Sequence, residues 1–511
     1  MDEIAIGVEA LTEQQVLAVA RHDAQVRLSD EARKAIGASR DIIEALAGDT
    51  EPHYGISTGF GALATKQIAP HDRAALQRSL IRSHAAGSGA EVEREVVRAL
   101  MLLRLSTLAT GRTGVRLETA ETYAAMLNAG ITPVVYEFGS LGCSGDLAPL
   151  AHCALAAMGE GTVRVGGSAR SAAEALAAAG ITPVVLREKE GLALTNGVDG
   201  MLGMLTLATY DLALLFRTAD LAAAMSVEAQ LGTDAVFAAD LQALRPHPGQ
   251  ADSAANLRTL LAGSAIMASH RTGDCTRVQD AYSLRCSPQV HGAGRDTLAH
   301  ARLVRDRELA SAIDNPVITL DGRVESNGNF HGAPVGYVLD FLAIAAADLA
   351  SIAERRTDRF LDRARNHGLP PFLADDPGVD SGYMIAQYTQ AALVSELKRL
   401  AVPASVDSIP SSAMQEDHVS MGWSAARKLR RAVDALTQVL AIEILTAARA
   451  LDLRLPLTPA PATAAARDAL RQRVAGPGPD RYLAPDIAAA VELVRSGRLV
   501  AAAEAVCGPL H

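Results

Sequence analysis

The chain has 511 residues, which is enough for a large hydrophobic core and for more than one domain. Hydrophobic residues make up 49% of it and charged residues 21%, the balance of a soluble globular protein. The formal net charge of −10 argues against a nucleic-acid binder, because no excess of basic residues offsets the repulsion from phosphates.

The N-terminus and the cysteines predict a cytoplasmic location. The sequence starts Met-Asp-Glu-Ile-Ala-Ile-Gly, which is acidic and lacks the basic and apolar regions of a signal peptide. The cysteines are scattered, odd in number and without a C-x-x-C pair, which argues for a reducing compartment and against a disulfide frame or a zinc site. They are Cys143, Cys153, Cys275, Cys286 and Cys507.

The predicted fold class is mainly α, a long-helix bundle preceded by an N-terminal head with minor short strands. We expect the head at residues 1–200, with strands at Thr162–Val165 and Pro183–Leu186. The bundle and a C-terminal helical region follow at 201–511, across a soft boundary within one integrated unit. Apolar residues recur at three- and four-residue spacing, which predicts bundle helices at 201–230, 338–365, 384–401 and 419–452.

Two apolar runs, near 341–353 and 433–449, are interrupted by acidic residues and are predicted to be buried helices rather than membrane spans. The heptapeptide Ala-Gly-Ile-Thr-Pro-Val-Val occurs twice, at 129–135 and at 179–185. Each copy follows an Ala-rich helix, so it is interpreted as a helix stop with Gly at C′, and not as a repeat architecture.

The segment from Gly139 to His152 holds the strongest local signals. A Gly-Ser-Leu-Gly turn leads into Cys143-Ser-Gly145, and Asp146 has the type and position of a helix N-cap. Pro149 then lies in the first turn, and Gly159 is the expected stop. On these signals alone an ordinary capped loop is the commoner explanation. A serine hydrolase is excluded, because the fifth position of G-x-S-x-G is not Gly and no triad partners are identifiable.

The longer string Gly139-Ser-Leu-Gly-Cys-Ser-Gly-Asp-Leu-Ala-Pro-Leu-Ala-His152 resembles the signature of the aromatic amino-acid ammonia-lyases, a family of histidine, phenylalanine and tyrosine lyases and related aminomutases. Further stretches resemble family blocks, in the family's order and at its approximate spacing. They are Tyr54-Gly-Ile-Ser-Thr-Gly-Phe-Gly61, Arg82-Ser-His-Ala-Ala-Gly87, Leu194-Thr-Asn-Gly197, Gln279-Asp-Ala-Tyr-Ser-Leu-Arg-Cys286, Gly328-Asn-Phe-His331 and Met414-Gln-Glu-Asp-His-Val-Ser-Met421.

The resemblance implies a 4-methylidene-imidazol-5-one (MIO) electrophile made from Cys143, Ser144 and Gly145. The amide nitrogen of Gly145 would attack the carbonyl carbon of Cys143, and Ser144 would lose water. Cys143 stands where the family usually has Ala, but the cyclisation uses its carbonyl and not its side chain. Glycine at position 145 suits strained backbone angles. No metal-binding motif is recognisable in the sequence. None of the lysines stands in the context of a pyridoxal phosphate site; they are Lys34, Lys66, Lys189, Lys398 and Lys428.

The resemblance also assigns roles to residues outside this segment. Tyr54 corresponds to the catalytic tyrosine that acts on the β-carbon, and Arg285 to the arginine that pairs with the substrate carboxylate. Asn196, Gln279 and Tyr282 correspond to polar residues that orient the substrate and support the MIO carbonyl. Phe330 corresponds to a residue that lines the wall of the substrate pocket. Each of them taken singly has a commoner structural explanation, such as core, turn or surface charge.

Substrate choice is predicted from His84 and from Gln415-Glu416. Phenyl-handling relatives usually lack the glutamate, and a carboxylate can accept an imidazole N–H. The competing explanation is that Ser412-Ala-Met-Gln415 is a capping box and that the acid merely favours a helix start. Met414 stands where the family commonly has Asn.

The resemblance therefore implies an enzyme that converts L-histidine to trans-urocanate and ammonia, a carbon–nitrogen lyase of histidine degradation. It also implies a homotetramer whose active sites are shared between subunits, without nucleic acid or membrane. The alternatives are a phenylalanine or tyrosine ammonia-lyase or aminomutase, and an inactive helical scaffold. Gly59-Phe-Gly-Ala-Leu-Ala64 also fits a dinucleotide fingerprint, which is rejected because no strand–turn–helix unit surrounds it.

Overall fold

A computed structural model describes residues 3–49, 51–59, 66–271 and 278–511. The chain divides into two compact units. Unit 1 comprises Met1–Leu207, Arg302–Asp340 and Pro403–Arg427, and unit 2 comprises Ala208–Ala301, Phe341–Val402 and Lys428–His511. A domain boundary near residue 200 stays a prediction. Beyond that prediction, the structure shows that two later segments pack with the N-terminal residues.

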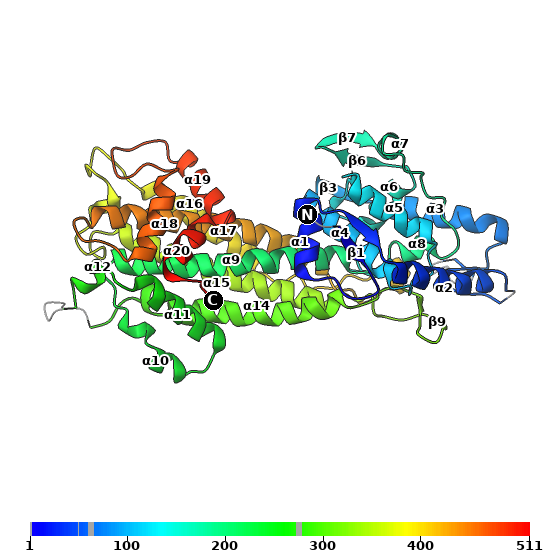
Figure 1. The fold of residues 1–511 in the computed structure, drawn as a ribbon, viewed down its shortest axis with the longest axis horizontal. Coiled ribbons are helices and arrows are strands. Elements are labelled where there is room, and N and C mark those ends of the chain that lie inside the picture. The colour runs from blue at the N-terminus through cyan, green and yellow to red at the C-terminus, as the bar shows by residue number, and fades with distance from the viewer. Residues whose placement is uncertain (1–2, 50, 60–65, 272–277) are drawn as a thin grey trace. The chain divides into compact units, whose positions relative to one another are not determined.

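Unit 1 is a helical layer with small sheets at its surface (Figure 1). Its helices are α1 (Glu13–His22), α2 (Asp30–Ala47), η2 (Pro70–Asp72), α3 (Arg73–His84), α4 (Arg94–Ala109), α5 (Leu117–Asn128), α6 (Leu147–Ala157), α7 (Ala172–Ala178), α8 (Glu190–Ala193) and η5 (Ser412–Met414). Its strands are β1 (Ile4–Ile6), β2 (Val26–Leu28), β3 (Ser88–Glu91), β4 (Thr132–Pro133), β5 (Tyr136–Phe138), β6 (Thr162–Val165), β7 (Ser168–Ser171), β8 (Val317–Ile318) and β9 (Val324–Glu325).

The strands of unit 1 form four small sheets. β1 pairs with β2 in parallel, with Ile4 opposite Val26. The other pairs are antiparallel: β3 with β5, β8 with β9, and the three-stranded order β4-β6-β7. These strands are too short to carry a core of their own. The core of unit 1 is therefore helical and lies around α4, whose residues from Val96 to Ala109 are all buried, with α1, α2, α5 and α6 packed against it (Figure 1).

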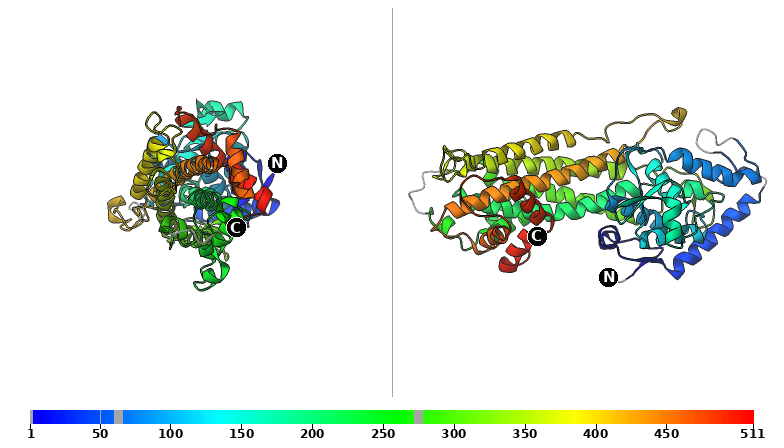
Figure 2. Two further views of the ribbon diagram at one scale, coloured as in Figure 1. Left: turned by 90° about the vertical axis from the view of Figure 1, so that its left-hand side faces the viewer. Right: turned by 90° about the horizontal axis from the view of Figure 1, so that it is seen from above.

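Unit 2 consists of helices and loops in the part that the structure describes. Its own helices are η3 (Ala235–Phe237), α10 (Ala239–Ala243), α11 (Pro248–Leu261), α12 (Ala265–Ala268), α13 (Tyr282–Arg285), η4 (Pro371–Leu373), α16 (Met384–Leu400), α18 (Pro461–Arg471), α19 (Ala484–Arg495) and α20 (Arg498–Cys507). The C-terminal helix α20 packs against α18 and α19 (Figure 2).

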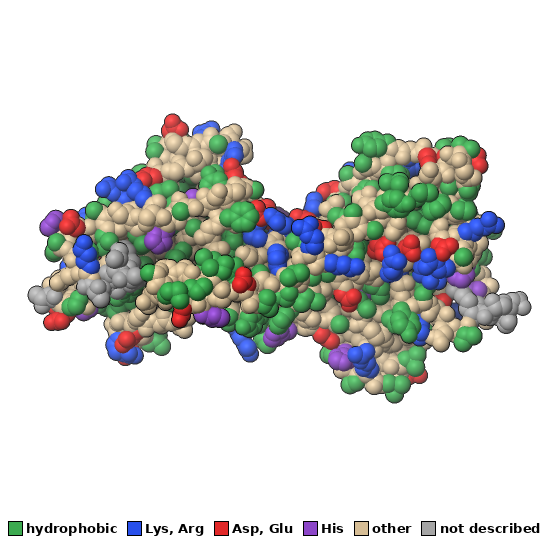
Figure 3. Space-filling view, turned by 180° about the vertical axis from the view of Figure 1, so that it is seen from behind, with side chains coloured by type: hydrophobic (Ala, Val, Ile, Leu, Met, Phe, Trp, Pro, Cys, Tyr) green, Lys and Arg blue, Asp and Glu red, His purple; other side chains and the backbone are tan. Residues whose placement is uncertain are grey.

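Four long helices contribute residues to both units: α9 (Asp199–Ala229), α14 (Ser287–Leu309), α15 (Ala333–Leu361) and α17 (Gly422–Leu453). The helices expected at 201–230, 338–365, 384–401 and 419–452 correspond to α9, α15, α16 and α17, so the mainly α fold class is confirmed. α9 and α15 are long and apolar enough to cross a membrane, but 78% and 61% of their apolar windows are buried inside the protein. That burial favours core helices. On the face drawn in Figure 3, acidic and basic side chains lie close together.

Local stop signals were predicted well. Gly130 and Gly180 follow α5 and α7 with φ of 65° and 70°, and Gly159 follows α6 with φ of 79°. After α5, the amide of Ile131 donates to Met126 and that of Gly130 to Leu127, which is a Schellman motif.

One strand prediction is confirmed and one is wrong. Thr162–Val165 is strand β6. Pro183–Leu186 is not a strand, because it finds no partner: Pro183 has no N–H to donate, and the amide of Val184 donates to Ala157 at the end of α6. Extended backbone without a neighbouring strand remains a loop.

Candidate functional site

The loop between β5 and α6 makes a tight turn at residues 142–145. Gly142, Ser144 and Gly145 have φ of 86°, 49° and 86°, and Gly142 and Gly145 face each other in an isolated bridge. A left-handed backbone at a serine costs about 1–2 kcal/mol, so the surrounding contacts must hold it in place. Ser140 supplies two of them: its hydroxyl accepts from the amide of Gly142 at 3.3 Å and lies 3.1 Å from an oxygen of Asp146.

The segment Asn196-Gly197, directly before α9, supports the turn from the other side. The Gly197 amide donates to the Ser144 carbonyl at 3.2 Å, and the Gly197 carbonyl accepts from the Asp146 amide at 2.8 Å. A Cβ built on Gly145 would lie 1.9 Å from the Gly197 carbonyl oxygen, so only glycine fits at position 145. Asn196 is buried, and its side-chain amide donates to the carbonyls of Leu192 and Asn315.

Asp146 occupies the N-cap position of α6, as predicted, but its side chain does not cap that helix. The buried carboxylate instead accepts from the amides of Gly200 and Met201, at 3.0 and 2.9 Å, in the first turn of α9. The side-chain part of the capping prediction is therefore wrong, because a long-range partner replaced the local one. Burial raises the pKa of Asp146 to about 7, although the hydrogen bond from Met201 opposes that shift.

Glu416 lies beside this loop. The segment that follows it contacts the loop directly, because the Met421 amide donates to the Leu141 carbonyl at 3.1 Å. Burial raises the pKa of the Cys143 thiol, and the Glu416 carboxylate adds to that shift. Oε2 of Glu416 is buried and has no hydrogen-bond partner among the described residues. An unpaired buried carboxylate oxygen is costly, so a donor from a bound molecule would stabilise it.

The capping-box explanation for Ser412 to Gln415 is wrong. No α-helix begins there: η5 is a single turn whose three residues have φ between 50° and 70°, and no side chain caps it. The turn closes through two backbone hydrogen bonds between Ser411 and Glu416, at 2.9 and 3.4 Å. Gln415 is exposed in this turn, and Glu416 is half-buried.

The turn that contains Phe330 packs against the same part of unit 1. Cβ atoms built on Gly332 and on Gly142 would lie 3.1 and 2.2 Å from the hydroxyl of Ser420, so both segments contact this residue. The ring of His331 stacks on that of His418, with centroids 5.8 Å apart. Phe330 itself is half-buried.

Tyr54 and His84 also belong to unit 1. Tyr54 is half-buried in a turn whose next residue, Gly55, approaches Leu192 so closely that an added Cβ would lie 2.6 Å from its side chain. His84 ends α3, and burial lowers its pKa. The chain continues from there to Gly87, whose Cα would lie 3.1 Å from a Cβ built on Gly139.

Three predicted residues, Gln279, Tyr282 and Arg285, belong to unit 2, whereas the turn at 142–145 belongs to unit 1. Tyr282 and Arg285 form α13, and the guanidinium lies 4.7 Å from the centre of the tyrosine ring. Tyr282 is 71% exposed, and Nε of Arg285 is buried without a partner among the described residues.

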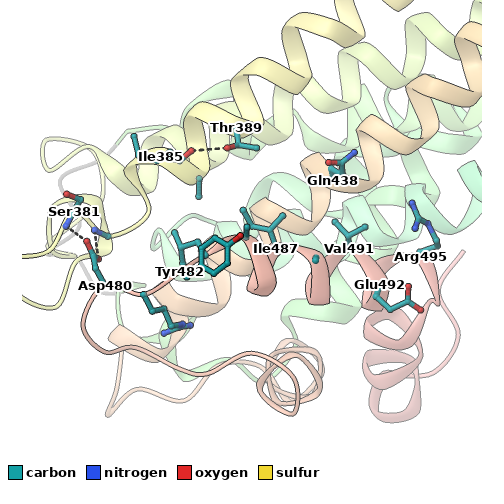
Figure 4. Close-up of a pocket in the computed structure, with 16 residues that line it drawn as sticks. Ser381, Ile385, Thr389, Gln438, Asp480, Tyr482, Ile487, Val491, Glu492 and Arg495 are labelled. Atoms are coloured by element: carbon teal, nitrogen blue, oxygen red, sulfur yellow. Dashed lines mark hydrogen bonds between the residues drawn. The ribbon is translucent and has the colours of Figure 1, made fainter.

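Unit 2 also holds a pocket of about 800 Å³ between α16 and α19 (Figure 4). Ile385 and Thr389 on α16 lie opposite Tyr482 and Ile487, and none of the predicted site residues lines it. The described cysteines, Cys143, Cys153, Cys286 and Cys507, are free thiols. Cys275 and most of Gly59–Ala64 lie outside the described residues. No group of metal-ligating side chains occurs among the described residues.

The family model for aromatic amino acid lyases matches residues 11–472. The chain belongs to the aromatic amino acid lyase family. It is 67% identical to the histidine ammonia-lyase of Streptomyces avermitilis, over the whole of both chains.

Two solved structures share the fold of this lyase-family chain. The tyrosine aminomutase of Streptomyces globisporus superposes with a TM-score of 0.93 at 39% identity and covers 100% of both chains. The histidine ammonia-lyase of Trypanosoma cruzi superposes with a TM-score of 0.91 at 37% identity, over 99% of this chain and 95% of the other. Members with different named reactions thus share one fold, and side chains in the site must distinguish them.

Sequence reasoning missed several residues that shape the site of this lyase-family chain. The sequence indicates only a turn at Gly197. In the structure its amide donates to the Ser144 carbonyl, and its carbonyl accepts from the Asp146 amide. Ser420 and Met421 belong to the family-like stretch 414–421, but the sequence assigns neither of them a role. In the structure the Met421 amide donates to the Leu141 carbonyl at 3.1 Å. Arg104 left one signal, an arginine inside the apolar run of α4. A charge in such a run needs buried partners, which the sequence does not identify.

Proposed function

We propose that this chain is a histidine ammonia-lyase that eliminates ammonia from L-histidine and gives trans-urocanate, with an electrophile formed from Cys143, Ser144 and Gly145. The observation that carries the proposal is the left-handed Ser144 turn, held by Gly197 and lying beside Glu416. The 67% identity to a histidine ammonia-lyase over the full length supports the choice of substrate.

The residues of the turn fit an internal cyclisation. The Gly145 amide nitrogen would bond to the Cys143 carbonyl carbon. The oxygen of that carbonyl would leave as the first water with the hydrogens of the Gly145 and Ser144 amides, and a C=N bond would form between the Cys143 carbon and the Ser144 nitrogen. Ser144 would then lose its α-hydrogen and its hydroxyl as the second water. A turn with Ser144 and Gly145 at positive φ brings these groups close, and no side chain at 145 could be accommodated against Gly197. The resulting MIO group would supply an electrophile that no standard side chain offers.

The chain's own residues have separate tasks in this proposal. Tyr54 removes the β-proton of the substrate. The amide of Gly197, in the peptide that it shares with Asn196, supports the Ser144 carbonyl. Glu416 accepts an N–H of the imidazole, for which its unpaired oxygen is available. Burial lowers the pKa of His84, which favours the neutral imidazole. Its Nδ1 lies 3.1 Å from the Ser83 hydroxyl, which leaves Nε2 for the substrate. Gln415 and Phe330 complete the wall around the ring.

Arg285 binds the substrate carboxylate through two parallel hydrogen bonds, and Gln279 and Tyr282 lie beside it along the chain. The 71% exposure of Tyr282 is unusual for an aromatic site residue, and it supports a homotetramer in which these residues complete the site of another subunit. We place the enzyme in the cytoplasm and assign it no metal and no pyridoxal phosphate.

Turnover of defined substrates tests the proposal. Purified protein is mixed with L-histidine, L-tyrosine or L-phenylalanine, and the absorbance of the unsaturated product is followed, with Ser144→Ala as the matched control. We expect urocanate from L-histidine alone and almost none from the control. Preference for L-tyrosine or L-phenylalanine would instead assign one of those lyases or aminomutases. No turnover of any of them would leave an inactive scaffold.

A further inference from the structure

Arg104 is a fully buried arginine on α4, and it plays no part in the roles assigned so far. Its side chain has no solvent exposure, and its neighbours along the helix include Leu102, Leu103 and Leu105. Moving a guanidinium out of water is costly unless its donors are satisfied. The partners that offset this cost therefore indicate what the residue holds.

Those partners are backbone carbonyls around the site. Nη1 of Arg104 donates to the carbonyls of Ala193, at 3.2 Å, and of Asn196. Nη2 donates to the carbonyl of Ile313 at 3.1 Å and lies 3.4 Å from the carboxylate of Asp199. One planar group thus joins the end of α8, the segment before α9 and the loop between α14 and β8.

The guanidinium lies directly behind Gly197. A Cβ built on Gly197 would be 2.9 Å from Nη2 of Arg104 and 2.4 Å from the Asp199 carboxylate, so no side chain could separate them. The Gly197 peptide in turn contacts the turn at 142–145, through its amide on Ser144 and its carbonyl on Asp146. Only one peptide unit therefore lies between Arg104 and the cyclising residues.

A second buried pair supports the same segment. Lys189 and Asp314 form an ion pair with no exposure of either side chain. The neighbouring Asn315 accepts at its carbonyl from the side-chain amide of Asn196, at 3.1 Å. The side chain of Asn196 is thus held from the 314–315 side while Arg104 holds its carbonyl. The segment is fixed at both of its polar groups.

We propose that Arg104 is a positioning residue that aims the Gly197 amide at the Ser144 carbonyl, both while residues 143–145 cyclise and during turnover. The inference rests on the proposed function. In the cyclised group, attack on the methylidene carbon would place negative charge on the Ser144 carbonyl oxygen, and a fixed N–H donor would stabilise that charge more than a mobile one. A guanidinium suits this task because its several N–H donors hold the carbonyls of Ala193, Asn196 and Ile313 from one side chain.

The test compares Arg104→Met with Arg98→Met, in the full chain. Arg98 is the matched control because it lies on the same helix and is also fully buried, and it donates to the carbonyls of Val19 and Leu127, away from the turn. Intact mass measures the fraction of folded chains that have lost two waters, and kinetics give kcat and KM per dehydrated chain.

We expect folded Arg104→Met to contain several-fold fewer dehydrated chains, and to lose kcat more than KM. Arg98→Met should remain dehydrated like wild type. Full dehydration of Arg104→Met with wild-type kcat per dehydrated chain overturns the inference, as does an equal loss in Arg98→Met. Should Arg104→Met fail to fold, Arg104→Lys decides by the same two measurements, with an intermediate loss expected and wild-type values contradicting us. Wild-type protein without the mass deficit would refute the proposed function itself.

Discussion

At the scale of single residues, Gly145 is the position where a single methyl group should decide the outcome. Gly145→Ala must displace the Gly197 carbonyl, since the added Cβ would lie 1.9 Å from its oxygen. We expect folded Gly145→Ala to keep the unmodified mass and to lack turnover of L-histidine. Intact mass spectrometry of the purified variant measures this directly.

The control is Gly130→Ala, which also places alanine at a positive φ but has no atom within 4 Å of the new methyl group. It should lose about 1–2 kcal/mol of stability from backbone strain and keep both the mass deficit and the activity. A dehydrated and active Gly145→Ala would show that the close contact with Gly197 does not constrain the cyclisation.

A substitution of Glu416 should change activity on L-histidine much more than it changes stability. If its unpaired oxygen accepts an imidazole N–H and the carboxylate takes part in proton transfer, Glu416→Ala should lower kcat/KM for L-histidine by about 10²–10⁴, while the melting temperature changes little. Asp417→Ala is the control, because this neighbouring acid is exposed. Equal activity of the two variants would remove Glu416 from the substrate site. A lost helix cap cannot account for reduced activity of the Glu416 variant, since no α-helix begins at this turn.

At the scale of elements, Asp146 joins α6 to α9, and its protonation should set a pH dependence of stability. In the folded protein the pKa of Asp146 is about 7, above the ordinary value of 3.8. Between pH 3.8 and 7 the folded state therefore binds the proton more tightly than the unfolded state does. The contribution of Asp146 to stability is therefore full below about pH 4 and is lost as the pH rises to about 7.

Asp146→Asn, which does not titrate, should remove this part of the dependence. Urea unfolding at several pH values measures it, as the difference in unfolding free energy between wild type and variant. We expect that difference to shrink with rising pH. A constant difference would place the folded pKa of Asp146 near its ordinary value.

Elements also mark the limit of what the sequence predicts. The long helices followed from apolar spacing, and the ends of α5, α6 and α7 from glycines at C′, because these signals act within a few residues. The strand at Pro183–Leu186 and the side-chain cap of Asp146 were wrong because each depended on a partner elsewhere in the chain, which a local pattern does not identify. The capping box at Ser412 was wrong for a different reason: residues 412–414 form a left-handed turn, and no α-helix begins there.

The site shows the same limit. The family string identified residues 143–145, and the blocks identified Glu416, Asn196 and Tyr54. The contact of Gly197 with Ser144 and the buried Arg104 behind it involve residues about 50 and 90 positions apart, as the separations of the paired residues show. Side chains that meet through folding, rather than through spacing, are visible only in the structure.

At the scale of the whole molecule, the division of predicted site residues between units has a consequence for assembly. Ser144 belongs to unit 1 and Arg285 to unit 2, and Tyr282 beside Arg285 is 71% exposed. Under the proposed function, these residues of one chain complete the site of another. Two variants that are each inactive should then restore activity when their chains assemble together.

We expect Ser144→Ala and Arg285→Ala, expressed together, to regain a substantial fraction of wild-type turnover of L-histidine, because mixed assemblies contain sites with an intact serine from one chain and an intact arginine from another. Ser144→Ala alone should be nearly inactive because residues 143–145 cannot form the electrophile without the serine hydroxyl. Arg285→Ala alone should be strongly impaired, since a lost hydrogen bond to a charged group costs about 1.5–3 kcal/mol even before misplacement of the substrate is counted. The control replaces the first chain by Ser144→Ala/Arg285→Ala, which leaves no chain with an intact arginine and should restore nothing. Absence of recovery in stable mixed assemblies would mean that Ser144 and Arg285 act within one chain.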